Sequence, residues 1–205
     1  MPPSGHSGFG TNRFPVRGVA VALVILATVG CGSARPVGRV AVPAGSRSAD
    51  QRAAAIYSAV IRELVTKDNT FGSAPRSVKV IYVLDHPIEG AGDPEAQATT
   101  RGSQEGFSEA LKMAIRARLA ELFPVKFVPS RSSAVVGEEA GASPGHVRAG
   151  GVLITLGPIV EEEGEVRVGN SWWMNGLAGQ WSTYVLGERG AGWKVTGLSG
   201  PIAIS

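Results

Sequence analysis

The last quarter of the chain contains four β-rich runs that are joined by short, glycine-rich connections. The runs cover residues 152–156, 165–173, 181–186 and 193–196. Parallel strands need a crossover of a dozen or more residues, whereas connections this short join antiparallel neighbours. The spacing therefore predicts an antiparallel meander at the C-terminal end of the fold.

A helix and a strand are predicted ahead of this meander. Apolar residues recur from Ile56 to Val65 at the spacing of one helical face, over about four turns. Ser48 followed by Gln51 has the pattern of a capping box and predicts that the helix begins there. The run 78–84 is short and β-branched, which predicts a buried strand.

A second helix is predicted over 103–123, where Pro124 ends it. Its apolar stripe comprises Phe107, Leu111, Ile115, Leu119 and Leu122. Residues 125–128 then form a short strand, and residues 129–150 read as a long loop of serine, glycine and glutamate.

This order of elements predicts an α+β fold, in which two helices cover one face of a mostly antiparallel sheet of five or six strands. The arrangement resembles the nuclear-transport-factor-like and cystatin-like folds. The segment 183–197 also resembles the C-terminal part of uncharacterised bacterial proteins, which implies a shared final hairpin. Neither resemblance implies a chemistry, because such folds host many functions. One domain over 49–205 is expected.

Residues 1–30 have the pattern of a secretion signal. Arg13 and Arg17 precede the apolar run 18–29 with no acidic residue between them, and this run is shorter than the ~20 residues that span a bilayer. The run leads into Ala-Thr-Val-Gly-Cys, which ends at Cys31 and resembles the bacterial lipobox. In that family the cysteine is acylated and becomes the first residue. The resemblance implies a lipid anchor on the extracytoplasmic side of the cell membrane or outer membrane.

Residues 31–48 are rich in glycine, proline, alanine and serine and are predicted to be a tether. Three arginines in it would add attraction to an anionic leaflet, or would simply keep the linker soluble. Cys31 is the only cysteine, which excludes a disulfide framework.

Composition and motif searches narrow the class of function. Basic residues number 20 and acidic residues 17, an excess too small to indicate nucleic-acid binding. Hydrophobic residues make up 43% of the chain, which is too apolar for general disorder. The sequence has no nucleophile-elbow serine, dinucleotide fingerprint or phosphate-binding loop motif. We expect no cofactor and no resident metal, and a domain that acts by binding.

Two clusters are candidate sites. Asp85, His86 and Asp93 follow the first predicted strand and define the alternative function, a small extracytoplasmic enzyme or metal-binding protein. In the other interpretation, these residues form an ordinary solvent-exposed end of a strand and carry no function. Trp172 and Trp173 are adjacent in a predicted strand and must face opposite sides of the sheet.

Alternation predicts that Trp172 enters the core and that Trp173 lies on the other face. An exposed Trp173 would bind a sugar or peptide, whereas a covering element would make it part of the core. The favoured function is a membrane-anchored binding or interaction domain. Its expected partners are the membrane, through Cys31, and an envelope component or small molecule.

Overall fold

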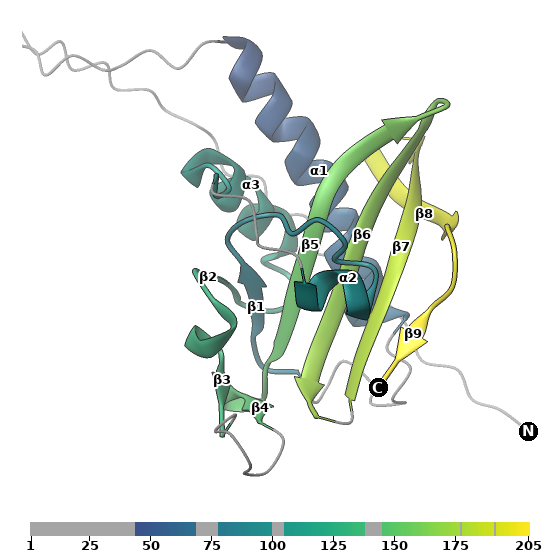
Figure 1. Ribbon diagram of the computed structural model, residues 1–205. Coiled ribbons are helices and arrows are strands. Elements are labelled where there is room, and N and C mark those ends of the chain that lie inside the picture. Colours follow the sequence, from purple (N-terminus) through teal and green to yellow (C-terminus); the bar gives the residue numbers. More distant parts are fainter. Residues whose placement is uncertain (1–43, 69–77, 100–104, 138–144, 177, 191) are drawn as a thin grey trace, which may run out of the picture. The chain divides into compact units, whose positions relative to one another are not determined.

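The computed structural model describes residues 44–68, 78–99, 105–137, 145–176, 178–190 and 192–205 (Figure 1). The chain divides into two units, and these residues belong to the second, Ala41–Ser205. The predicted signal peptide, Cys31 and most of the predicted tether lie outside the described residues.

The described part contains three α-helices in its first half and a run of strands in its second half. The helices are α1 (Ala44–Thr66), α2 (Pro94–Thr99) and α3 (Glu109–Leu119), with 3₁₀ turns at Arg131–Ser133 and Arg148–Gly150. The strands are β1 (Ile81–Leu84), β2 (Val125–Val128), β3 (Val135–Val136), β4 (His146–Val147), β5 (Val152–Glu162), β6 (Glu165–Asn175), β7 (Ala178–Arg189), β8 (Gly192–Leu198) and β9 (Ala203–Ile204). None of the helices in this part combines the length and the apolar character that a bilayer crossing requires.

The strands form one mixed sheet that is mostly antiparallel. Strands β5, β6, β7 and β8 pair with one another in sequence order as the predicted meander. Strand β1 pairs in parallel with β2 and with β5, because the segment carrying α2 and α3 supplies the crossover that a parallel pair needs. The α+β class is confirmed. All six predicted strands are present, and β3, β4 and β9 add two-residue strands.

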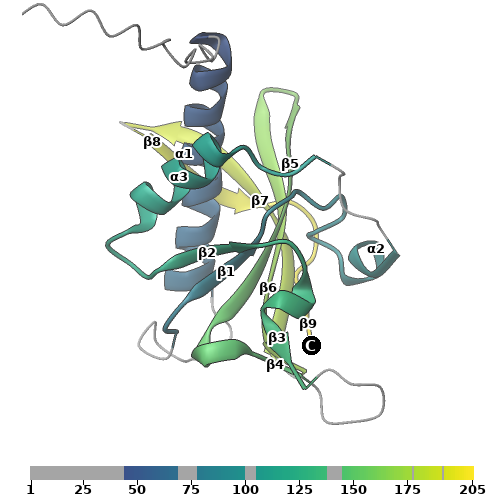
Figure 2. The ribbon, with the colours of Figure 1, turned by 90° about the vertical axis from the view of Figure 1, so that its left-hand side faces the viewer.

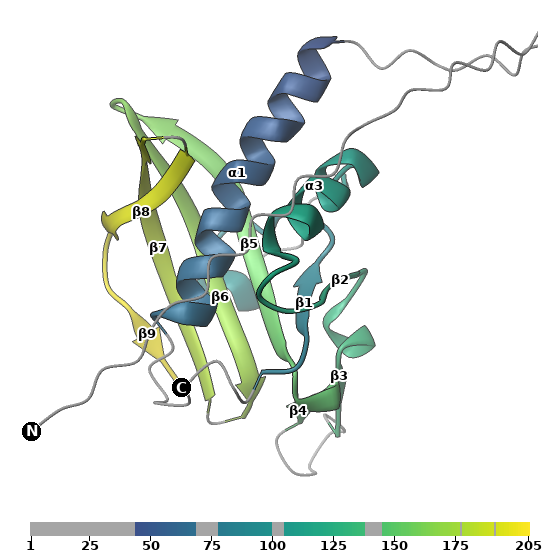
Figure 3. The same cartoon turned by 180° about the vertical axis from the view of Figure 1, so that it is seen from behind.

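Helices α1 and α3 cover one face of the sheet, here called the first face (Figure 3). The predicted stripe of α1 is buried, with Ile56, Val60 and Ile61 fully inaccessible. The predicted capping box is wrong, since α1 already begins at Ala44 and Ser48 lies inside it. In the sequence Pro43 directly precedes Ala44, and proline favours the start of a helix.

Helix α3 is shorter than predicted. The hydroxyl of Ser108 accepts a hydrogen bond from the Leu111 amide at 3.0 Å, which caps the helix at a later position than residue 103. The stripe residues Leu111, Ile115 and Leu119 are buried, and Phe107 is buried in the segment before the cap.

The opposite, second face of the sheet is covered by segments outside the two predicted helices. In Figure 2 the sheet is seen near its edge, with α1 and α3 on one side and α2 on the other. The predicted loop 129–150 contains β3 and β4, and their Val135 and Val147 join a second apolar cluster. A Cβ on Gly92 would lie 2.6 Å from the Ser182 carbonyl oxygen, so only glycine permits this close approach of the 85–93 loop.

Candidate functional site

Asp85 and His86 form a local pair at the end of β1. The His86 Nδ1 lies 2.9 Å from the Asp85 Oδ1, and the Lys112 Nζ lies 3.8 Å from the other carboxylate oxygen. The side chains of Asp85 and His86 are 28% and 22% exposed. The aspartate is therefore shared between a neighbouring imidazole and a lysine of α3.

Asp93 does not join this pair and instead caps a helix. Its Oδ1 accepts hydrogen bonds from the backbone amides of Glu95 and Ala96, at 2.8 and 3.2 Å, and so caps α2. Among the described residues, no three histidine, cysteine, aspartate or glutamate side chains are grouped so that they could hold a metal ion. The structure thus does not assemble Asp85, His86 and Asp93 into the metal site of the alternative interpretation.

Trp172 and Trp173 face opposite sides of the sheet, as alternation predicts. Trp172 joins the core of the first face, and Trp173 joins the cluster on the second face. Of the two alternatives for Trp173, the covered one holds and the exposed binding ring does not, because only 8% of the residue is accessible. Strands β3 and β4 pack into the same cluster, and the Arg131 guanidinium lies 3.8 Å from the Trp173 ring centroid.

A single amide anchors α2 on the second face. The Gln97 Nε2 donates to the Thr155 hydroxyl at 3.1 Å, while its Oε1 accepts from the Ser171 hydroxyl at 3.1 Å and from the Trp181 indole. These partners belong to β5, β6 and β7. Gln97 therefore ties α2 to three adjacent strands.

A groove of about 630 Å³ lies beside this anchor, and we call it the second-face groove. Its walls include Asp93, Pro94, Gly157, Arg167, Thr183 and Ser199. The Arg167 guanidinium is already paired with Glu165 at 2.9 Å and with Glu162 at 3.4 Å. Asp93 caps α2, so two of the three charged residues that line this groove are engaged in the fold, and Glu95 is the third.

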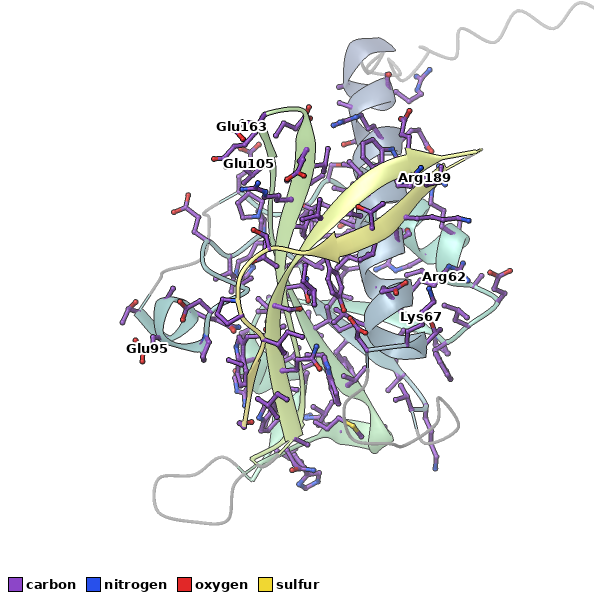
Figure 4. All side chains as sticks on the ribbon, turned by 90° about the vertical axis from the view of Figure 1, so that its right-hand side faces the viewer. Arg62, Lys67, Glu95, Glu105, Glu163 and Arg189 are labelled. Atoms are coloured by element: carbon purple, nitrogen blue, oxygen red, sulfur yellow. The ribbon has the colours of Figure 1, made fainter. Side chains whose placement is uncertain are left out.

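A second groove, of about 790 Å³, lies between α1 and the hairpin of β7 and β8, and we call it the α1–β8 groove. Its lining is formed by Gln51, Arg52, Ala55, Ser58, Ala59 and Arg62 of α1, by Arg118 of α3, and by Glu188, Gly190, Gly192, Trp193 and Lys194 of the hairpin. In Figure 4, Arg62 projects from α1 and Arg189 marks the tip of the hairpin that passes across this helix. Because the side chains of Ala55 and Ala59 are small, they leave space between α1 and the hairpin.

The α1–β8 groove is predominantly cationic. Arginine or lysine supplies four of its five charged side chains, and Glu188 is the exception. Arg52 pairs with Glu161 at 2.6 Å, and Arg62 pairs with Glu121 at 2.8 Å. Both glutamates are at least 60% exposed, and exposed ion pairs contribute only about 0–1 kcal/mol. A ligand anion could therefore replace Glu161 or Glu121 as the partner of the arginine at a small cost in free energy.

Ser58 adds a polar group that the fold leaves unsatisfied. The residue is 6% exposed, and its hydroxyl has no hydrogen-bond partner among the described residues. Leaving a buried hydroxyl unpaired costs about 1–3 kcal/mol. Ser58 is also among the residues that line the α1–β8 groove, although its Oγ is buried.

Two buried tyrosines donate hydrogen bonds that connect separate segments of the fold. Tyr57 of α1 donates to the Gly157 carbonyl oxygen at 3.1 Å, and burial raises the pKa of its hydroxyl to about 12. Tyr184 donates to the Asp68 carboxylate at 2.7 Å, and burial, followed by this hydrogen bond, raises its pKa. Both hydroxyls hold their protons at neutral pH and act as donors.

Comparison with known families, curated proteins and solved structures found no match to the chain.

Sequence reasoning missed the α1–β8 groove because it followed only the apolar face of α1. The available signal was the spacing of Ala55, Ser58 and Ala59, three small residues on one helical face between Arg52 and Arg62. That pattern predicts a hollow with a cation at each end. The contribution of Arg118 depends on how α3 packs beside α1, which no local pattern gives.

Proposed function

We propose that this chain is a membrane-anchored extracytoplasmic lipoprotein whose folded domain binds a ligand without transforming it. The α1–β8 groove carries this proposal, because it combines four cations, the Trp193 ring and the unpartnered Ser58 hydroxyl. Its volume of about 790 Å³ lies within the range of small-molecule sites. The ligand is an envelope component or a small molecule outside the cytoplasm.

The lining of the groove favours binding over chemistry. It includes no histidine or cysteine, and Glu188 is its one carboxylate. The Asp85–His86 pair is not among the lining residues. A ligand held here would be recognised through charge and hydrogen bonds and released unchanged.

The membrane location is supported by the sequence that precedes the domain. The lipobox resemblance ends at Cys31, and residues 32–43 connect that cysteine to α1. One acyl chain binds a membrane only marginally, whereas several chains on one cysteine give stable attachment. Fully extended, this connection spans at most about 45 Å, which keeps the domain close to the membrane surface.

Mass spectrometry of the protein from bacterial membranes tests the anchor. The expected mature chain begins at Cys31 and carries acyl groups, and Cys31→Ser should move the protein out of the membrane fraction. Ser33→Ala, a small change just outside the lipobox, serves as the matched control and should stay membrane-bound. An unmodified Cys31, or a chain that retains residues before it, would refute the anchor.

A further inference from the structure

We infer that the α1–β8 groove binds a phosphate group, carried either by a membrane lipid or by a soluble phosphate ester. This inference rests on the proposed function, since it names the ligand class of the same groove. The phosphate subsite comprises Ser58, Arg62 and Arg118, and Arg52 with Trp193 forms the opposite end.

The first step is the arrangement along α1. Ser58 and Arg62 are separated by one helical turn, so their side chains are neighbours on the same face. Arg52 precedes Arg62 by nearly three turns, roughly 15 Å along the helix. Inorganic phosphate alone would not reach both ends of the groove. The ligand should therefore have a body as well as an anionic group.

The Arg62 guanidinium is already held in place by hydrogen bonds within the fold. Its Nη2 donates to the Glu121 carboxylate at 2.8 Å and to the Arg118 carbonyl oxygen at 3.1 Å. The backbone contact ties Arg62 to the end of α3 that carries the Arg118 side chain. That side chain has no ion pair among the described residues, so its charge is available to a ligand.

The third step concerns the shape of the anion. Ser58 and Arg62 approach from α1, and Arg118 approaches from α3. Donors on two elements can bind several oxygens of a tetrahedral phosphate at once, whereas a planar carboxylate offers two oxygens in one plane. Arginine in particular matches phosphate through paired hydrogen bonds. Because the Oγ of Ser58 is buried, this side chain would turn toward the groove and gain the partner that the fold does not provide.

The fourth step concerns the body of the ligand. The Arg52 guanidinium lies 5.0 Å from the Trp193 ring centroid and is held by Glu161. These two side chains and the small residues Ala55 and Ala59 would contact a glycerol or sugar unit of the ligand. The groove thus fits a phosphate ester better than a bare ion.

The experiment uses the full chain carrying Cys31→Ser, so that acylation does not itself bind lipid. Titration calorimetry with glycerol 3-phosphate probes the soluble source. Flotation with phosphatidylcholine vesicles, with and without phosphatidylglycerol, probes the lipid source. Binding of glycerol 3-phosphate, or preference for the vesicles that contain phosphatidylglycerol, would support the inference and identify the source.

Two arginines of α3 provide a matched pair of variants. Arg118→Ala should weaken phosphate binding about tenfold or more, because a hydrogen bond to a charged group is lost. Arg116→Ala removes the same charge from the same helix, outside the lining, and should leave affinity within about twofold. Ser58→Ala should weaken binding less than Arg118→Ala but more than Arg116→Ala. Thermal melting confirms that each variant is folded.

The inference is overturned if neither probe binds, or if Arg116→Ala and Arg118→Ala have equal effects, which would indicate general charge attraction. This outcome is distinguishable from failure of the proposed function. An unacylated Cys31 would refute the membrane anchor and leave the phosphate titration unchanged. An acylated Cys31 with no phosphate binding would retain the lipoprotein and remove its ligand.

Discussion

The two grooves of the domain have similar volumes, about 790 and 630 Å³, but differ in charge. Four of the five charged side chains that line the α1–β8 groove are cationic, whereas the second-face groove is lined by Asp93, Glu95 and Arg167. In the second-face groove, Asp93 caps α2 and Arg167 is paired with two glutamates. In the α1–β8 groove, Arg118 has no ion pair and Ser58 has no hydrogen-bond partner within the described part of the chain. We therefore expect unsatisfied polar groups, rather than volume, to distinguish the groove that binds a ligand.

The two faces of the sheet are also held in different ways. On the first face, α1 and α3 contribute an apolar core that includes Ile61 and Ile115, both fully buried. On the second face, α2 contributes no buried residue and is attached through Gln97. Substitutions should therefore affect the two faces by different amounts.

The largest expected effect is on the first face. Ile115→Ala should lower the free energy of unfolding by about 2–5 kcal/mol, because it leaves a cavity beneath α3. Met113→Ala on the same helix, where the side chain is 61% exposed, should change it by less than about 0.5 kcal/mol. Urea unfolding midpoints measure both, and equal shifts would show that the stripe of α3 is not the buried one.

The stability of the fold should depend on pH through Tyr57, which connects α1 on the first face to Gly157 of β5. Its pKa is near 10.0 when unfolded and about 12 when folded, so its protonated form stabilises the fold fully below pH 10. Stability should fall by roughly 2–3 kcal/mol as pH rises through this interval. Tyr184, whose pKa is also raised, should contribute in the same direction.

The control for this effect is Tyr57→Phe, which removes the titrating group. The variant should be about 1 kcal/mol less stable at neutral pH, because the hydrogen bond to Gly157 is lost. Its stability should then fall less steeply between pH 10 and 12 than that of the parent protein. Identical slopes for the two proteins would contradict the role of Tyr57.

On the second face, Gln97→Ala should cost about 1–3 kcal/mol, because the Trp181 indole and the Ser171 and Thr155 hydroxyls lose a partner. Hydrogen exchange of the α2 amides should accelerate in this variant. Thr99→Ala, which removes an exposed hydroxyl of the same helix, should leave both measurements nearly unchanged. Unaltered exchange in the Gln97 variant would show that α2 is held by other contacts.

Local patterns predicted the elements that pack by their own periodicity. The apolar spacing from Ile56 to Val65 established the buried face of α1, and alternation placed Trp172 and Trp173 on opposite faces. These predictions succeeded because burial of one helical face or one side of a strand follows directly from period.

The candidate site depended on contacts between distant segments. Trp173 is covered by strands from a segment that has the composition of a loop, and Asp93 caps a six-residue helix with no apolar stripe. Ser58 becomes a candidate ligand-binding residue only because β8 and α3 flank α1. No single window of sequence contains that information.

The most direct measurement records the indole N–H signals of the four tryptophans by nuclear magnetic resonance while glycerol 3-phosphate is added to the full chain. Trp193 lines the α1–β8 groove, Trp181 binds Gln97 on the second face, and Trp172 and Trp173 are buried. We expect the Trp193 signal to shift until the protein is saturated, while the other three signals stay in place. A shift confined to Trp181, with Trp193 unmoved, would contradict the account.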